Sequence, residues 1–250
     1  MKKTFRLAIP ILLLFLFSTQ RLLAQATATP TGTPTCTQFT DTFGSSASLN
    51  NYNYYGWEAS TAAALSYQVA SGELQVAPAS GTVYSWALAM NSVYNQSLGD
   101  YTAQADFKLD TAAQGIFGPV FRSNGPVSEC YTFEWNGLDG EWMIEKECAS
   151  GSYYYPACNT GNLYTLGTWV HLMVTASGGT FNAWETPESA PGVASGAAVQ
   201  VFTNVTDSVV CAGGSSALTA AYTSGDPGIR AYNIVAGNIL HIQNFTVGCH

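Results

Sequence analysis

Glu141 and Glu145 are the two residues whose type and spacing most directly suggest catalysis. They are four residues apart, so in a β-strand their side chains project from the same face. Two carboxylates on one face can stand on either side of a glycosidic bond as nucleophile and acid. The alternative is solvated charge on an exposed strand after a turn, because a motif without its structural context is weak evidence. We therefore expect no catalytic residue, and Glu141 and Glu145 are the candidates if there is one.

Scarce positive charge and an aromatic ring mark a second group of candidates. A β-hairpin is predicted around 136–140, where Asn, Gly and Asp favour a turn. With this hairpin, one face of the sheet is expected to carry Arg122, Glu134, Trp142 and Lys146. Glu134 and Lys146 would then be diagonal neighbours across two strands. The alternative to a binding face is a surface ion pair, which contributes little to stability.

Three consecutive tyrosines, Tyr153, Tyr154 and Tyr155, form the third feature. Neighbouring residues of a strand point to opposite faces, so at least one of these rings should be exposed or lie in a groove. Sugar rings stack on aromatic side chains while nearby polar groups bind the hydroxyls. The alternative is a ring cluster that covers a sheet face or an interface. The predicted ligand-binding set is Arg122, Glu134, Trp142, Tyr153, Tyr154 and Tyr155.

The elements that must position these residues are predicted to be short β-strands. From residue 38 onward, runs rich in Val, Tyr, Phe, Trp and Thr alternate with Gly, Asn, Ser and Pro, and no apolar pattern with a helical period persists. The predicted strands are 39–43, 53–58, 66–70, 73–77, 82–90, 101–109, 116–122, 129–135, 141–147, 168–176, 180–185, 198–203, 217–222, 228–233 and 238–247. So many short strands indicate an all-β sandwich or barrel, and we expect residues 38–250 to form a single domain.

The amino terminus carries the pattern of a secretory signal peptide. Residues 1–26 combine a basic start, an apolar run at 7–17 and small residues near the expected cleavage point. This apolar run is too short for a membrane-spanning helix, which needs roughly 20 residues, so no stable membrane insertion is expected after cleavage. Residues 27–37 are rich in Thr and Pro and are predicted to form a linker.

Charge excludes several classes of partner. Removal of residues 1–26 leaves four basic against 16 acidic residues, a formal charge of −12. Four cations cannot neutralise a run of phosphates, so nucleic acid is excluded as a partner, and an anionic membrane surface is disfavoured by the same charge. A glycan or another cell-surface component is the partner that this composition allows.

All six cysteines lie beyond the predicted signal peptide, and an even number in an exported chain indicates disulfides. Cys130 and Cys148 are symmetrical about the predicted hairpin turn and are expected to bond across it. The first and last cysteines bracket the domain, whose terminal strands are expected to lie side by side. The remaining two cysteines are assigned to each other. The predicted disulfides are Cys36–Cys249, Cys130–Cys148 and Cys158–Cys211.

Several motifs follow one another in an order typical of one superfamily. They are DTF at 41–43, YTAQADFKLD at 101–110, a Gly-x-Trp-x-x-Leu strand at 167–172, GIRAY at 228–232 and NFTV at 244–247. Their order resembles the concanavalin A-like jelly-roll domains of the laminin-G type found in bacterial secreted proteins. The resemblance covers residues 38–248 and implies a jelly-roll sandwich of two antiparallel sheets. The superfamily contains lectins, carbohydrate-binding modules, glucanases and lyases, so the fold does not select a function.

The same resemblance bears on catalysis and on metal binding. The segment EWMIE at 141–145 resembles the Glu-x-Asp-x-Glu strand of the superfamily's glucanases, but Met143 replaces the middle acid, which argues against hydrolysis. Some jelly rolls hold a structural calcium ion, for which Asp41 is the candidate ligand here. Apart from such a calcium ion, we expect no cofactor. The three histidines, at 171, 241 and 250, show no metal-ligand spacing.

These features predict a secreted or cell-surface domain that binds a neutral carbohydrate without catalysis. One alternative is a glycoside hydrolase or polysaccharide lyase of the same fold that uses Glu141 and Glu145, or Glu134. Another alternative is a structural or adhesion module with no small ligand. The first hypothesis predicts binding without turnover, the second predicts turnover, and the third predicts neither.

Overall fold

The structure is a computed structural model that describes residues 38–56, 65–78, 86–91, 99–110, 115–123, 129–148, 153–161, 164–207, 222–232 and 234–249. In these ranges the regular structure is strand, apart from one short 3-10 helix, η1 (Ser46–Asn51). No helix among the described residues is long and apolar enough to cross a membrane. The predicted signal peptide, 1–26, and the predicted linker, 27–37, lie outside the described residues.

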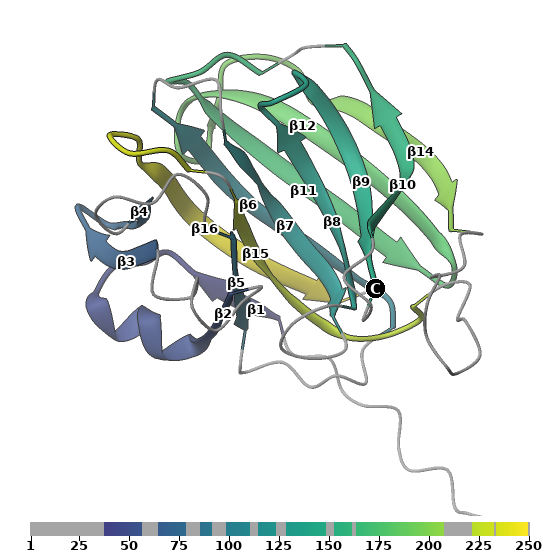
Figure 1. Cartoon of the computed structure of the whole chain (residues 1–250), viewed down its shortest axis with the longest axis horizontal. Helices are drawn as coiled ribbons and strands as arrows, with labels where there is room; N and C mark the ends of the chain where they lie inside the picture. Colours follow the sequence, from purple (N-terminus) through teal and green to yellow (C-terminus); the bar gives the residue numbers. More distant parts are fainter. Residues whose placement is uncertain are drawn as a thin grey trace, which may run out of the picture. The chain divides into compact units, whose positions relative to one another are not determined.

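The strands form two antiparallel sheets, which confirms the predicted all-β sandwich. Among the described residues, sheet A has nine strands in the order β13-β12-β11-β6-β16-β4-β3, with β1 added to β16 and β14 added to β12. Their bounds are β1 (Phe39–Asp41), β3 (Leu65–Ala70), β4 (Glu73–Pro78), β6 (Tyr101–Leu109), β11 (Trp169–Ser177), β12 (Thr180–Ala190), β13 (Val193–Ala194), β14 (Val199–Thr206) and β16 (Leu240–Cys249). Strands distant in sequence are neighbours, since β16 lies between β6 and β4 (Figure 1).

Sheet B has seven strands among the described residues, in the order β10-β9-β8-β7-β15-β5-β2. Their bounds are β2 (Tyr52–Gly56), β5 (Trp86–Asn91), β7 (Ile116–Ser123), β8 (Cys130–Asn136), β9 (Glu141–Glu147), β10 (Tyr153–Asn159) and β15 (Asp226–Tyr232). The strand β15 lies between β7 and β5, so sheet B also pairs strands that are distant in the sequence.

Alternation along the strands places one apolar layer between the two sheets. In β6 most alternate residues are fully buried, as the two-residue period of a strand requires. Phe107 of β6 stacks on Phe117 of β7 with ring centroids 5.3 Å apart. Phe181 of β12 meets Phe121 of β7 edge to face at 5.1 Å. Rings of sheet A therefore pack directly against rings of sheet B, and each sheet keeps an outer face for other contacts.

The hairpin between β8 and β9 corrects the predicted register by one residue. Cys130 lies opposite Glu147, and Asn136 lies opposite Glu141. The turn contains four residues and closes with a hydrogen bond from the Gly140 N–H to the Asn136 carbonyl at 2.8 Å. The predicted pairing of Cys130 with Cys148 centres the turn on residue 139, half a residue later than the observed pairing. A shift of one residue moves every side chain of a strand to the other face relative to its partner.

The disulfide predictions are corrected with the register. Cys130 lies opposite Glu147, not Cys148, and is a buried free thiol. The predicted Cys130–Cys148 bond is therefore wrong. Cys158 is an exposed free thiol, so the predicted Cys158–Cys211 bond is also wrong. Cys148 and Cys249 are each disulfide-bonded. Cys36 and Cys211 lie outside the described residues, so the predicted Cys36–Cys249 bond stays a prediction.

Two strands extend beyond the predictions from the sequence. The strand β10 was not among the predicted strands, although its tyrosines were singled out. The strand β12 continues to Ala190 and turns back into β13, where the prediction ended the strand at residue 185. Pro187 and Pro191 in this region weaken the strand signal, because proline lacks the N–H that a sheet requires. The predicted strand 217–222 lies almost entirely outside the described residues.

Candidate functional site

The outer face of sheet B carries charged side chains instead of the apolar ones found on its inner face. On β8, Phe133 belongs to the core, so by alternation Thr132 and Glu134 project outward. On β15, Ile229 belongs to the core and Arg230 projects outward. On β9, Glu145 lies opposite Thr132 and Glu147 lies opposite Cys130, so both glutamates also project outward.

These outward residues converge on one guanidinium group. Arg230 Nη1 donates to Glu134 Oε2 and to Glu145 Oε1, both at 2.8 Å, and to Thr132 Oγ1 at 3.2 Å. Arg230 Nη2 lies 3.3 Å from Glu147 Oε1. Thr132 Oγ1 also donates to Glu134 Oε2 at 2.7 Å. We call Arg230, Glu134, Glu145 and Glu147 the Arg230 cluster.

A glycine allows the arginine to reach these carboxylates. Arg230 lies on β15 and Glu134 on β8, with β7 between the two strands. The β7 residue directly opposite Arg230 is Gly118, which has no side chain to block the path. A Cβ atom at Gly118 would lie 1.9 Å from the Phe133 carbonyl oxygen, far inside contact distance. Only glycine therefore fits where the arginine crosses β7.

Burial controls the charge of the cluster. Glu134 and Arg230 are almost completely shielded from solvent. Burial raises the pKa of Glu147 to about 8, partly opposed by Arg230 and reinforced by Glu145. Burial likewise raises the pKa of Glu134 well above its usual range. Burial disfavours the charged form of Arg230, but the three glutamates outweigh it and raise the pKa of the guanidinium. At neutral pH the cluster thus holds protonated carboxyl groups beside a charged arginine.

Some oxygen atoms of the cluster are unsatisfied. Glu134 Oε1 and Glu147 Oε2 are buried, and neither has a hydrogen-bond partner among the described residues. Buried polar atoms in native proteins are nearly always paired with protein or with water. The cluster therefore retains hydrogen-bonding capacity that the described part of the chain does not use.

Two tyrosines form an exposed aromatic surface beside the cluster. Tyr153 is opposite Glu147 in the pairing of β10 with β9, so both project from the outer face. Tyr153 and Tyr155 are 61% and 44% exposed, and their ring centroids are 5.7 Å apart. Partial burial and then the charge of Glu145 raise the pKa of Tyr155, which places this ring near the cluster. The prediction that the tyrosine run exposes a ring is confirmed.

Three of the residues predicted to share this face lie elsewhere. Trp142 is fully buried in the core, where its ring meets Phe133 and Trp135. Lys146 also points inward, and its Nζ lies 2.5 Å from Asp207 Oδ2. The expected diagonal contact between Glu134 and Lys146 is therefore wrong. The cause is the register, since each residue of β9 faces opposite to the predicted side.

Arg122 is a structural residue of the core edge. It is fully buried, and its Nη1 donates to the Tyr222 carbonyl at 2.9 Å. Its Nη2 donates to the Gly99 carbonyl at 2.8 Å, and its guanidinium lies over the Phe181 ring. Arg122 thus ties two connecting segments to β7, whereas Arg230 occupies the position that the sequence analysis gave to Arg122.

The two candidate catalytic glutamates have different surroundings. Glu145 is bound to Arg230, while Glu141 is the first residue of β9, beside the turn. The alternative of solvated charge is wrong for Glu145 and Glu147, because both are buried.

Asp41, the candidate calcium ligand, is engaged by the protein itself. Its Oδ1 accepts from the Phe43 N–H at 2.8 Å and from Ser48 Oγ at 2.7 Å. Its Oδ2 accepts from Asn51 Nδ2 at 3.1 Å. Asp41 therefore ties β1 to η1, and this fully accounts for a buried carboxylate at this position.

Arg230 and Glu147 are the members of the cluster that the sequence analysis missed. The signal for Arg230 was present, since Ile229 and Ala231 flank it in a predicted strand and alternation sends it outward. It is also one of only four cations beyond the predicted signal peptide. No sequence pattern indicates that β15 lies two strands from β8.

Comparison with known proteins supports the fold. No family model matches the sequence, and no curated protein matches it. Among solved structures, carbohydrate-binding module CBM66 from Bacillus subtilis is 14% identical with a TM-score of 0.50, covering 80% of this chain and 97% of that one. Lectin UEA-II in complex with galactose is 11% identical with a TM-score of 0.53, covering 85% and 98%.

A third similar structure is the exoplasmic/lumenal domain of VIP36 in a form bound to Ca²⁺ and Man3GlcNAc. It is 11% identical with a TM-score of 0.50, and the match covers 80% of this chain and 84% of that one. At such low identity these likenesses concern the fold alone. The chain has the concanavalin A-like jelly-roll fold, as its sequence motifs predict.

Proposed function

We propose that this chain is a secreted carbohydrate-binding domain whose ligand stacks on Tyr153 and Tyr155. The observation that carries the proposal is the exposed tyrosine pair on the outer face of sheet B. Exposed, adjacent aromatic rings are unusual on a soluble domain and mark a binding surface. Tyrosine offers an apolar ring face to the C–H groups of a sugar and a hydroxyl to its polar rim.

The Arg230 cluster supports this surface from the side. It joins β8, β9 and β15 through buried charged hydrogen bonds, so the strand β9 that carries β10 is held rigidly. A rigid surface loses less conformational entropy when a ligand binds. We assign the tyrosines to ligand contact and the cluster to positioning. A neutral sugar suits the site better than an anionic one, because the chain has few cations and the cluster contains more acids than bases.

The structural neighbours agree with this proposal. One is a carbohydrate-binding module, one is a lectin in complex with galactose, and one is bound to Man3GlcNAc. Because one fold can serve many functions, the exposed tyrosines remain the primary support for carbohydrate binding.

We propose binding without turnover. Glu134 and Glu145 both accept hydrogen bonds from Arg230 Nη1, at 2.8 Å each, so this nitrogen stands between the two carboxyl groups. The catalytic carboxyl groups of a glycosidase instead flank the scissile bond, about 5–5.5 Å apart in retaining enzymes and further apart in inverting ones. Glu134 is held by Arg230 and is fully buried.

Export of the chain belongs to the same proposal. The segment 1–26 has the features of a signal peptide. Cys148 and Cys249 are disulfide-bonded, and disulfides persist in oxidising compartments outside the cytosol. A secreted or cell-surface location fits both observations.

The test is a glycan array followed by calorimetry on each glycan that binds. Tyr155→Ala and Tyr153→Ala should each weaken binding about tenfold, the effect of losing roughly 1.4 kcal/mol of contact. Tyr154→Ala is the matched control, because alternation sends its side chain to the other face of the same strand. Mass spectrometry of each incubated glycan should show no cleavage products.

Three outcomes would overturn the proposal. Equal loss of affinity in Tyr154→Ala and Tyr155→Ala would mean that the strand, and not the exposed rings, carries binding. Cleavage products that disappear in Glu145→Gln would establish an enzyme instead. A chain that binds no glycan on the array would favour the structural or adhesion module.

A further inference from the structure

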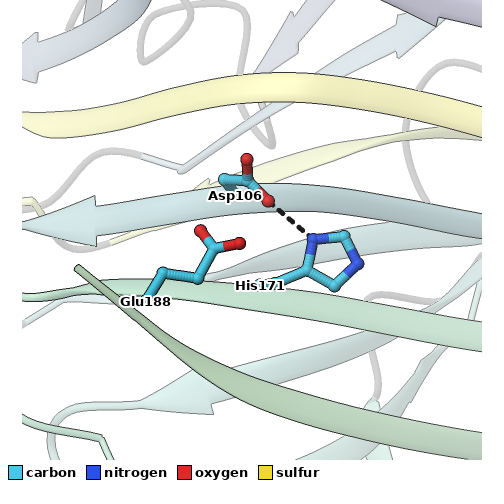
Figure 2. A group of neighbouring side chains, drawn as sticks. All are labelled: Asp106, His171 and Glu188. Atoms are coloured by element: carbon cyan, nitrogen blue, oxygen red, sulfur yellow. Dashed lines mark hydrogen bonds and ion pairs between the residues drawn. The ribbon is translucent and has the colours of Figure 1, made fainter. Parts of the chain in front are cut away.

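A second polar cluster lies on the outer face of sheet A, on three neighbouring strands. Asp106 of β6 is directly opposite His171 of β11, so both side chains project from one face. His171 Nδ1 and Asp106 Oδ1 are 2.6 Å apart. Glu188 comes from β12, the next strand, and Figure 2 shows its carboxylate directed toward the other two side chains. One ligand atom from each residue lies within 4.8 Å of the others.

The Glu188 side chain, whose carboxylate is directed toward this cluster, has an unsatisfied oxygen atom. Glu188 is only 7% exposed, and its Oε2 has no hydrogen-bond partner among the described residues. A buried carboxylate oxygen without a partner is costly, because burial removes its hydration. The arrangement therefore lacks a positive group at this point.

The Asp106 side chain is held in position from behind by Asn244. Asn244 Nδ2 donates to Asp106 Oδ2 at 2.6 Å, which leaves Asp106 Oδ1 directed at His171. Asn244 adopts a φ of 51°, in a bulge where β16 shifts its register against β6. Outer partners of this kind fix the direction of a metal-binding side chain.

The surroundings add negative charge and access for a ligand. A cavity of about 210 Å³ is lined by Glu188, Trp169 and Ser195, and also by Glu185. Glu185 is 1% exposed, and its Oε2 likewise has no partner among the described residues. Two buried acids thus border a space large enough for water. Lys108, the nearby cation on β6, lies over the Trp169 ring and 3.9 Å from Asp110.

We propose that Asp106, His171 and Glu188 bind a divalent metal ion of the zinc type. One imidazole and two carboxylates suit zinc better than calcium, which takes oxygen ligands. The ion takes the place of the hydrogen that bridges Asp106 and His171, and in the neutral imidazole this hydrogen moves to Nε2, so that Nδ1 binds the ion. Their atoms then separate from 2.6 Å to roughly 3.3 Å, the spacing set by bonds of about 2.0–2.1 Å in a tetrahedron. Water from the cavity supplies the fourth ligand.

The proposed metal site is separate from the proposed sugar site. Its ligands lie on β6, β11 and β12 of sheet A, whereas Tyr153 and Tyr155 lie on β10 of sheet B. By joining three neighbouring strands, the ion would stabilise sheet A against unfolding. Metal binding and carbohydrate binding can therefore be tested independently of each other.

The test is titration of the chelator-treated, purified chain with zinc ions by calorimetry. All proteins in this experiment carry Cys158→Ser, because the exposed Cys158 thiol would otherwise compete for zinc. The wild-type site should bind one zinc ion per chain. Glu188→Gln and His171→Gln should each weaken zinc binding more than about tenfold. Loss of a residue that only hydrogen-bonds to a metal ligand already costs about tenfold or more in metal affinity, and loss of a ligand costs more.

His241→Gln is the matched control on the same face of sheet A. His241 Nδ1 lies 2.6 Å from Glu73 Oε2, and its Nε2 lies 3.1 Å from Asp110 Oδ1, so carboxylates occupy both ring nitrogens. This variant should bind zinc like the wild type. Melting curves of the metal-free proteins establish that each variant is folded, and added zinc should raise the melting temperature only where the site is intact.

Three results would overturn the proposal. Zinc affinity that is unchanged in both Glu188→Gln and His171→Gln would place the ion elsewhere. Equal loss in His241→Gln would indicate unspecific binding to histidine. Absence of binding by the folded wild-type chain would show that the cluster is only a hydrogen-bonded group.

Discussion

Arg230 carries one positive charge into a cluster that contains three carboxyl groups. One arginine cannot balance three buried carboxylates, because each uncompensated buried charge is costly. The protein resolves this by protonation, and burial raises the pKa values of both Glu134 and Glu147. The stability of the domain is thereby linked to pH through individual glutamates.

Glu147 should make the folded state less stable as the pH rises. In the folded chain it keeps its proton up to about pH 8, whereas its ordinary pKa is 4.5. The folded state thus binds more protons in this interval, so the free energy of unfolding should fall between about pH 5 and pH 8, by at most about 1.4 kcal/mol per pH unit for this group. Glu147→Gln should show a shallower slope and be more stable than wild type at pH 8. Urea denaturation at several pH values measures both.

The control for this prediction is Glu141→Gln, which removes one carboxylate from the start of the same strand and so tests the loss of charge alone. Glu134 contributes in the same direction as Glu147, because its pKa is also raised by burial. Some slope should therefore remain in Glu147→Gln. An unfolding free energy that rises from pH 5 to pH 8 would contradict the assignment of protonated carboxyls.

At the scale of elements, β7 decides whether the Arg230 cluster can form. The strand separates β15 from β8, and Gly118 is the point at which the guanidinium passes over it. The backbones of β7 and β8 approach so closely here that a methyl group has no space beside the Phe133 carbonyl. The close approach of β7 and β8 and the Arg230 cluster therefore depend on the same glycine, Gly118.

Gly118→Ala should destabilise the domain by about 1–3 kcal/mol or more, the usual cost of forcing atoms into a packed region. The clash is with backbone atoms, which cannot rotate away as a side chain can. Gly179→Ala in the turn between β11 and β12 is the control, because a Cβ atom there meets nothing within 4 Å. Thermal denaturation of both variants measures the difference. Equal melting temperatures would contradict the described approach of β7 and β8.

The strands could be predicted from the sequence better than their pairing. Alternation in 101–109 and 169–174 identified β6 and β11, because a half-buried strand repeats its burial every two residues. The β8–β9 hairpin was also identified, but its turn was placed so that the register shifted by one residue. That shift assigned Trp142 to the wrong face. Alternation gives the two faces of a strand, whereas only the turn geometry decides which residues of two strands meet.

For the candidate site, local features could be predicted and distant ones could not. The exposed tyrosines follow from three consecutive rings in one strand, which is a local argument. Contacts of Arg230 with Glu134 join residues that are 96 positions apart in the sequence. Contacts of Asp106 with His171 span 65 positions, and so histidine spacing along the chain gave no signal of a metal site.

At the scale of the whole molecule, buried polar groups link the two sheets through the apolar core. Lys146 of β9 in sheet B pairs with Asp207, which follows β14 of sheet A, and both side chains are fully buried. Tyr131 of β8 donates to the same Asp207 carboxylate. The jelly roll therefore carries a polar link inside and a polar cluster on each outer face. Its cysteines are distributed in the same way, with one free thiol buried and one exposed.

Alkylation of the unreduced protein should distinguish these two thiols. Iodoacetamide should modify Cys158 in the folded chain, slowly, because burial and nearby acids raise its pKa and reduce the reactive thiolate. Cys130 should react only after unfolding in denaturant, because it is fully buried and its pKa is raised well above its usual range. Peptide mass spectrometry without reduction should then find both residues alkylated and Cys148 in a disulfide. A Cys130–Cys148 disulfide in the unreduced digest would contradict the observed register of β8 and β9, since that register directs Cys130 toward the side of Glu147 and away from Cys148.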